Sequence, residues 1–261
     1  LEDFEDQIFI DRNLKRITLK NNILKIDKDL VFPSGFSFEV DSNSVIVLEN
    51  NSNLIFESDF YTQPEKDIKV DFISTGKSCI IFKNNKIKVQ NMSFEGFANC
   101  EVSGIYLTGG INFYNSQINI NKLSAKNNKS GDDLINIVNS KFELNNLYME
   151  NSLYDALDID YSEGNIINIK CLNCGIKKGG DGIDLANSNI FIENAYISNS
   201  FDKGLSIGEN SQANIKNLIV QEANVCIANK DGSYTKIKYA EVKNCNIGLA
   251  AFNKKSYYDI S

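Results

Sequence analysis

Histidine and tryptophan are both absent from this chain of 261 residues, and proline occurs only twice. Without histidine, the chain has no Ser-His-Asp or Cys-His catalytic arrangement and no histidine-ligated metal site. Without tryptophan, it lacks the commonest platform for stacking sugar rings, although eleven tyrosines are available as substitutes. The shortage of proline suits stacked β-strands joined by polar turns.

Positive charge is also scarce. The chain has 27 lysines and arginines against 34 acidic residues, which gives a net charge of −7. Nucleic acids and anionic membrane surfaces require a basic face, so we expect neither as a partner. No apolar run is long enough to span a bilayer, so we expect no direct membrane insertion. An acidic polymer remains compatible with this charge if a cation mediates the contact.

Serines recur along most of the chain at nearly constant spacing. Successive intervals are 24, 22, 26, 23, 22 and 23 residues, and asparagine precedes four of the seven serines. A second ladder of Asn-Ser and Asn-Cys pairs lies about half a period away. Repetition at this period is typical of a solenoid. The serines are Ser116, Ser140, Ser162, Ser188, Ser211, Ser233 and Ser256.

Within each repeat the apolar residues alternate, as in Leu157/Ile159, Ile183/Leu185 and Leu205/Ile207. Alternation at period two indicates β-strands. Several short strands per repeat, with no helical run, predict an all-β parallel β-helix whose coils are about 22–26 residues long. A leucine-rich repeat is excluded because its fixed leucine pattern is absent.

We expect one elongated domain over residues 1–261, because each coil of a solenoid packs only on its neighbours. Residues 1–20 are predicted to cap the open end of the stack, where bare strand edges would otherwise invite aggregation. Residues 59–78 are polar, contain Pro64 and are predicted to form a longer loop. The chain starts at Leu1 and stops within the repeat at Ser261, so we expect a piece of a parent protein in which either another domain follows or the end is a cut.

Six cysteines are present, two of them in the pair Cys171-x-x-Cys174. A zinc or redox interpretation of that pair is weak because no second CxxC exists and the period places Cys174 in the asparagine ladder. We expect the cysteines to act as small buried apolar residues. A disulfide between adjacent coils, such as Cys226–Cys245, is compatible with the repeat.

Acidic residues fall into columns when the repeats are aligned on their inward residues. If Leu157 and Ile159 point inward, Asp158 points outward, because side chains alternate along a strand. Its equivalents in neighbouring coils are Asn136, Asp184 and Ser206, and a parallel column holds Asp133, Asp155, Asp181 and Lys203. Coils lie about 4.8 Å apart, so Asp155, Asp158, Asp181 and Asp184 should form one patch of carboxylates, flanked by Asp160.

Two carboxylates about 5 Å apart repel by about 3 kcal/mol at an effective dielectric near 20, so the patch needs an explanation. Calcium is one, because several aspartate oxygens suit this hard cation. A carboxylate with a raised pKa, available for acid/base catalysis, is the second. Charges that are simply solvated at turns are the third.

Several strings of residues are familiar at this point. LTGGINFYNS, SGDDLINIVNS, DALDID, GDGIDL, DKGLSIGENS, KDGS and LAAFNKKS resemble the pectate-lyase-like superfamily of right-handed parallel β-helices. More narrowly, they resemble bacterial β-helix modules found in proteins with spore-coat-kinase-like (CotH-like) domains. The resemblance covers roughly residues 20–258. It implies a right-handed single-stranded β-helix on a secreted or cell-surface protein.

The string GDGIDL is also similar to the acidic strand of one class of calcium-dependent pectate lyases. That resemblance implies Ca²⁺ as the cofactor, with Asp155, Asp158, Asp181 and Asp184 as its ligands and Lys203 as the base that abstracts a proton beside a uronate carboxylate. Asp158 and Asp184 are then also catalytic candidates. The chain departs from the class at Gly180, where a second consecutive aspartate is usual. Asp132-Asp133 is similar to the acidic pair of β-helix glycoside hydrolases, which use paired carboxylates, but the histidine of that family is missing.

We therefore carry three hypotheses, because a fold does not establish a function. The first is a lyase, less favourably a glycoside hydrolase, that binds an acidic polysaccharide through the acidic patch, with Asp160, Lys230 and Lys254 as further substrate contacts. Against it, Asp181 and Asp202 beside Lys203 should raise the pKa of that base. The second is a non-catalytic adhesive module, and the third is a structural spacer. Whether the protein is an enzyme stays open at this point.

Overall fold

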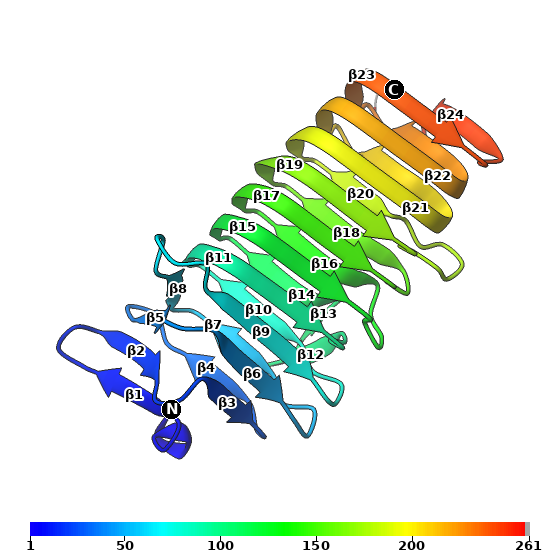
Figure 1. Cartoon of the computed structure of the whole chain (residues 1–261). Helices are drawn as coiled ribbons and strands as arrows, with labels where there is room; N and C mark the ends of the chain where they lie inside the picture. Colours follow the sequence, from blue (N-terminus) through cyan, green and yellow to red (C-terminus); the bar gives the residue numbers. More distant parts are fainter. Residues whose placement is uncertain (259–261) are drawn as a thin grey trace.

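The computed structural model describes residues 1–258 as a stack of about ten coils of parallel β-structure. This confirms the all-β, parallel β-helix class. Figure 1 shows the coils succeeding one another from the N-terminal hairpin to the C-terminal end. Within residues 1–258 the only helix is the single 3₁₀ turn η1 (Glu2–Phe4), and no helix has the length and apolar character needed to cross a membrane.

Each central coil consists of one short strand and one long strand that bends midway. The short strands pair side by side to form what we call the short-strand sheet, which the later halves of β21 and β22 complete. Its other members are β4 (Leu30–Phe32), β7 (Leu54–Phe56), β10 (Ile80–Lys83), β14 (Gly109–Tyr114), β16 (Asp133–Val138), β18 (Asp155–Asp160), β20 (Ile183–Ala186) and β24 (Ile247–Phe252).

The long strands form the rest of the wall. In the first coils two separate strands take the place of each long one. The long strands and their early counterparts are β3 (Ile23–Ile26), β5 (Ser37–Val40), β6 (Ser44–Leu48), β8 (Asp59–Thr62), β9 (Lys69–Ser74), β11 (Lys86–Glu95), β15 (Gln117–Lys126), β17 (Lys141–Glu150), β19 (Glu163–Leu172), β21 (Asn189–Gly208), β22 (Gln212–Lys230) and β23 (Tyr234–Lys243).

The core is a set of inward-facing columns, each contributed by one position per coil. Phenylalanines fill one column in the early coils, where Phe32, Phe56, Phe82 and Phe113 stack with ring centroids 4.9–5.0 Å apart. The same column continues through the aliphatic Ile137 in the later coils. Register is therefore fixed by burial, because a shift of one residue would turn the whole column outward.

The serine ladder has a direct structural cause. From Ser140 to Ser233, each serine follows the turn between a short and a long strand, and its hydroxyl accepts the N–H of the serine one coil earlier, as Ser162 does from Ser140 at 3.0 Å. The same bond joins four further pairs. The asparagine ladder works similarly at the opposite turn, where Asn173 Nδ2 donates to Asn151 Oδ1 at 3.0 Å. Both residues have positive φ, which asparagine tolerates better than most residues.

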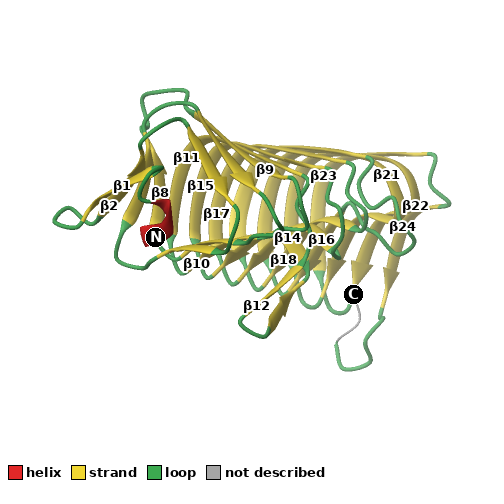
Figure 2. Cartoon of the chain, turned by 90° about the horizontal axis from the view of Figure 1, so that it is seen from below, coloured by secondary structure: helices red, strands yellow, loops and turns green. Residues whose placement is uncertain are grey.

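Residues 1–20, where we expect the cap, hold η1 and an antiparallel hairpin of β1 (Ile8–Asp11) and β2 (Arg16–Leu19). The longer loop predicted for residues 59–78 is wrong over much of its length. Strands β8 and β9 occupy most of it, because Phe60, Val70 and Phe72 are buried at period two while polar neighbours face outward. A second hairpin, β12 (Cys100–Val102) and β13 (Ile105–Leu107), lengthens one coil to 31 residues and projects from the stack (Figure 2).

All six cysteines pair, so the expectation that they serve only as small apolar residues is wrong. The disulfides are Cys79–Cys100, Cys171–Cys174 and Cys226–Cys245. The third is the pairing that the repeat allowed. The first ties the projecting hairpin to the core, and the second closes the turn after β19 rather than forming a zinc site. Three disulfides are typical of proteins outside the cytoplasm.

Candidate metal centre

The carboxylate columns lie on the outer surface of the short-strand sheet, which we call the acidic face. Strand pairing aligns Asn136 with Asp158, Asp158 with Asp184, and Asp184 with Ser206, as the alternation predicts. The parallel column is linked from coil to coil through the backbone. Asp155 Oδ1 accepts the N–H of Asp181 at 2.7 Å, and Asp181 Oδ1 accepts the N–H of Lys203 at 2.9 Å.

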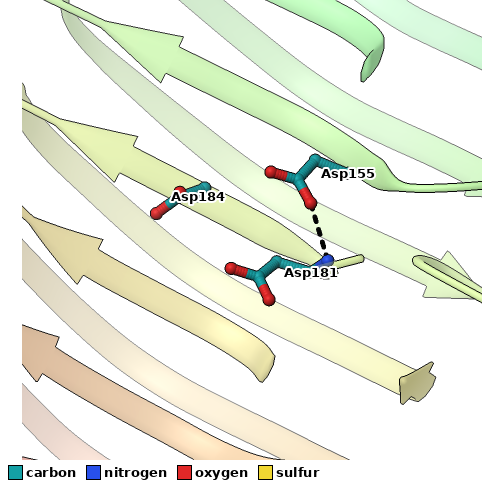
Figure 3. A group of neighbouring side chains, drawn as sticks. All are labelled: Asp155, Asp181 and Asp184. Atoms are coloured by element: carbon teal, nitrogen blue, oxygen red, sulfur yellow. Dashed lines mark hydrogen bonds between the residues drawn. The ribbon is translucent and has the colours of Figure 1, made fainter. Parts of the chain in front are cut away.

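Three carboxylates converge on this face. Ligand oxygens of Asp155, Asp181 and Asp184 lie within 4.8 Å of one another. Figure 3 shows the three side chains, contributed by two neighbouring coils, with the bond from Asp155 to the Asp181 backbone. Asp181 is buried, and the other two are partly buried. Asp158, the fourth predicted ligand, lies on the same face beside Asp184 but outside this group of three.

Burial disfavours the ionised form of Asp155, Asp158 and Asp181. Burial and then the charge of Asp181 raise the pKa of Asp155 to about 9. Burial also raises the pKa of Asp181, to about 6, although Lys203 opposes the shift. The pKa of Asp158 rises for the same reason, with Asp133 as the next contributor. Each of these groups would gain from a nearby cation, since an opposite charge stabilises the ionised carboxylate.

A lysine already neutralises part of the negative charge between the coils of Asp181 and Lys203. Lys203 Nζ lies 3.2 Å from both oxygens of Asp181 and 2.5 Å from Asp202. Burial opposes the charge on Lys203, but the two carboxylates outweigh it and raise the pKa of this amine. Lys203, the predicted base, therefore lies in the patch, and its raised pKa keeps the amine protonated. No lysine within residues 1–258 forms an ion pair with Asp155.

The predicted substrate contacts behave differently from one another. Asp160 lies on the acidic face, where burial raises its pKa to about 6. Lys230 is buried and places Nζ 3.7 Å from Asp184, so it reaches the patch from two coils away. Lys254 uses its backbone N–H to bind Asp231, and its side chain is exposed. Its neighbour Lys255 instead pairs with Glu209, and its charge partly opposes the rise in the pKa of Asp160.

Sequence reasoning missed the pair Lys255 and Glu209. Glu209 lies in the turn directly after β21, and Lys255 lies 46 residues further on, past the end of β24. The period placed Lys254-Lys255 beside the serine ladder, which was a signal for their position. It could not tell which of the two side chains faces the carboxylates.

Three buried polar atoms in one column of this face have no protein partner among the described residues. Oδ1 of Asn112 is farthest from the carboxylates in the register. The other two are Oγ of Ser206, which is next to Asp184, and Oδ1 of Asn136, which is next to Asp158. All three residues are at least 97% buried, and an unpaired buried oxygen costs about 1–3 kcal/mol. Calcium is bound by oxygen ligands in proteins. The carboxylates and unpartnered oxygens of this face therefore fit a hard divalent cation better than a thiophilic metal.

No protein-family model matches the chain, and no curated protein matches its sequence. Among solved structures, the chain is similar to a crystal structure of a double mutant of the periplasmic alginate epimerase AlgG. The two are 11% identical, the match covers 94% of this chain and 80% of the other, and the TM-score is 0.33. A likeness of this size carries no functional information. The function is therefore argued from the side chains of the acidic face.

Proposed function

We propose that this chain is an extracytoplasmic β-helix protein that binds calcium at Asp155, Asp181 and Asp184 and thereby binds an acidic polysaccharide. The observation that carries the proposal is the convergence of three carboxylates, one of which, Asp155, has no lysine paired to it within the described part of the chain. A protein gains nothing from such a cluster unless a cation, a proton or a ligand compensates it. The unpaired hydroxyl of Ser206 beside Asp184 supports a cation.

An acidic polysaccharide follows from the charges around the centre. Once calcium is bound, it would attract a uronate carboxylate and make the proton on the adjacent carbon more acidic. Lys203 and Lys230 lie within the same patch and would add to the attraction. The three disulfides support an extracytoplasmic, secreted or cell-surface location, where such polymers occur.

Cleavage of the polymer by β-elimination is a further part of the proposal. It needs a base, and Lys203 is the amine nearest to the carboxylate cluster. Because Asp181 and Asp202 raise its pKa, Lys203 must lose its proton before it can accept one from a substrate. Asp158 and Asp184 are the alternative acid/base groups, and they lie side by side on adjacent strands.

Calorimetric titration of calcium into the metal-stripped protein tests the centre. We expect one calcium site with a dissociation constant between about 10⁻⁶ and 10⁻³ M. Asp181→Asn/Asp184→Asn should abolish the binding heat, whereas Asp41→Asn, which alters an exposed aspartate elsewhere, should not. No heat with the unaltered protein, or equal heat with the double variant, would reject the centre.

Turnover is tested next with polyuronates, by following the ultraviolet absorbance of the unsaturated product. Loss of turnover in Lys203→Ala, with calcium binding retained, would support β-elimination. Polyuronate binding without turnover in the unaltered protein would reject that reaction and leave a binding protein.

A non-catalytic adhesive module is the second candidate function. A shallow hollow of about 730 Å³ crosses six coils on the long-strand side, and Tyr61, Lys88, Asn119, Asn165 and Phe191 are among its lining residues. Planar amides, a lysine and aromatic rings are groups that bind glycans or proteins without chemistry. Glycan affinity that survives Asp181→Asn/Asp184→Asn would favour this function.

A further inference from the structure

Two exposed aromatic side chains border the acidic face. Tyr154 immediately precedes Asp155, and Phe201 immediately precedes Asp202 and Lys203. Their exposed fractions are 38% and 53%. Tyr154 lies in the bend that leads into β18, and Phe201 lies within β21, at the register irregularity between Ser200 and Lys203. Both therefore belong to the edge of the same surface that carries the carboxylates.

The segments that carry these rings are joined through the turn between β19 and β20. The N–H of Lys177 donates to the carbonyl of Leu153 at 2.7 Å, and the N–H of Phe201 donates to the carbonyl of Gly175 at 2.7 Å. Three successive segments, with that turn in the middle, therefore make one continuous strip. The middle turn, which precedes β20, extends farther from the stack than its neighbours (Figure 1).

Between the two rings, this middle turn consists of two glycines without side chains and two exposed lysines. A Cβ on Gly180 would lie 2.9 Å from the Cα of Tyr154, so a side chain there would collide with the turn below. Gly179 has φ +93° and open space around it. The preceding residues, Lys177 and Lys178, are both exposed. Tyr154 and Phe201 are two coils apart, or about 10 Å, with the glycine pair between them.

This combination has the chemistry of a site for an acidic sugar. A sugar ring presents an apolar C–H face and polar edges, and an exposed aromatic ring covers the apolar face while leaving the edges to polar groups. Lysines at the same strip complement a carboxylate on the sugar. Phe9 and Tyr234 are exposed aromatics that lie away from these three segments, and single exposed aromatics are ordinary surface residues.

We propose that Tyr154, Lys177, Lys178 and Phe201 form a subsite, here called the aromatic rim, that stacks against the rings of an acidic polysaccharide and binds its carboxylates. The proposal rests on the function proposed above, because the polymer is the one that calcium would hold on the acidic face. It adds the residues that recognise the sugar rather than its charge alone. A polymer running along the coil axis would contact the rim and the metal centre at once.

Affinity for short galacturonate oligomers, measured by calorimetry with the calcium-loaded protein, tests the rim. Tyr154→Ala/Phe201→Ala should weaken binding about tenfold or more, because well-placed aromatic residues carry a large share of binding energy. Phe9→Ala/Tyr234→Ala is the matched control and should bind as the unaltered protein does. Lys177→Ala/Lys178→Ala should weaken binding and reduce its dependence on salt. Calcium affinity should be unchanged in all three.

The outcomes separate the rim from the metal centre. Unchanged oligomer affinity in Tyr154→Ala/Phe201→Ala, with calcium-dependent binding intact, would overturn the rim and leave the proposed function standing. Binding that needs the rim but not calcium would support the rim and reject the calcium-dependent function. A protein that binds no galacturonate or alginate oligomer, with or without calcium, would reject both.

Discussion

At the scale of single residues, Asp155 shows how the acidic face depends on what is bound to it. Its carboxyl is partly buried and accepts a backbone hydrogen bond, yet burial and Asp181 raise its pKa to about 9. An unfolded aspartate has a pKa near 3.8. Between these two values the folded protein keeps a proton that the unfolded chain has released. Stability therefore falls as the pH rises through this window.

Metal-stripped protein should accordingly melt at a lower temperature at pH 8 than at pH 5. Asp155→Asn should reduce this slope, because the amide has no proton to lose, and Asp41→Asn should not. Calcium should raise the melting temperature at pH 8 and have little effect at pH 4, where protons occupy Asp155 and Asp181. Scanning calorimetry over pH 4–9 measures this, and each 1 kcal/mol corresponds to roughly 2–4 °C. A melting temperature that rises with pH in the absence of metal would contradict the assignment.

Which residues meet on the acidic face followed from strand alternation and repeat length. The columns through Asp158 and Asp155 needed only the inward direction of Leu157 and the period. The raised pKa of Lys203 followed from the same register. The contacts of Lys230 and Lys255 did not, because they depend on how far a long side chain reaches and on the path of residues 253–258 after the last strand.

At the scale of elements, neighbouring strands are matched by shape as well as by register. Gly164 on β19 lies directly beside Phe142 on β17, in a column that is otherwise occupied by side chains. A Cβ at Gly164 would lie 2.3 Å from the Phe142 ring, so the ring fills the space that the glycine leaves. The sequence shows a glycine inside a strand, which indicates a close approach, but it does not say what approaches.

Gly164→Ala should therefore lower the free energy of unfolding by about 1–3 kcal/mol, the usual cost of overpacking. Phe142→Leu should recover part of this loss when combined with Gly164→Ala, although it is destabilising alone. Urea unfolding of the four proteins forms a double-mutant cycle that measures the coupling. Gly248→Ala is a suitable control, because a Cβ there would come no closer than 3.4 Å to another atom. Gly35→Ala is not, because the φ of Gly35 is +77°, which strains any other residue. Additive effects at positions 142 and 164 would contradict the packing described here.

Strands β8 and β9 lie in the segment that the sequence pattern wrongly predicted as a loop. Their inward residues alternate as elsewhere, but Asp59, Lys69 and Asp71 among the outward ones made the segment resemble a loop. The disulfides were equally hidden. Cys79 and Cys100 are brought together only because the hairpin of β12 and β13 interrupts one coil, and no repeat spacing encodes that interruption.

At the scale of the whole molecule, the two ends of the stack differ. One aliphatic column passes through ten coils, from Leu30 to Leu249. Its member Leu205 is fully buried, whereas Leu249 in the last coil is 67% exposed. Within residues 1–258, no further strand pairs with β24 on its outer side. In a solenoid each coil is stabilised by both neighbours, so the last coil should be the least stable part of the described chain.

Leu205→Ala and Leu249→Ala compare the two positions with the same chemical change. The first should cost about 2–5 kcal/mol, because it leaves a cavity between packed coils. The second should cost less than about 1 kcal/mol, since most of this side chain is already in water. Hydrogen exchange should agree, with fast exchange over β23 and β24 and slow exchange over β17 to β21. Equal losses of unfolding free energy in the two variants would mean that Leu249 is covered in solution, which would contradict the exposure seen in the structure.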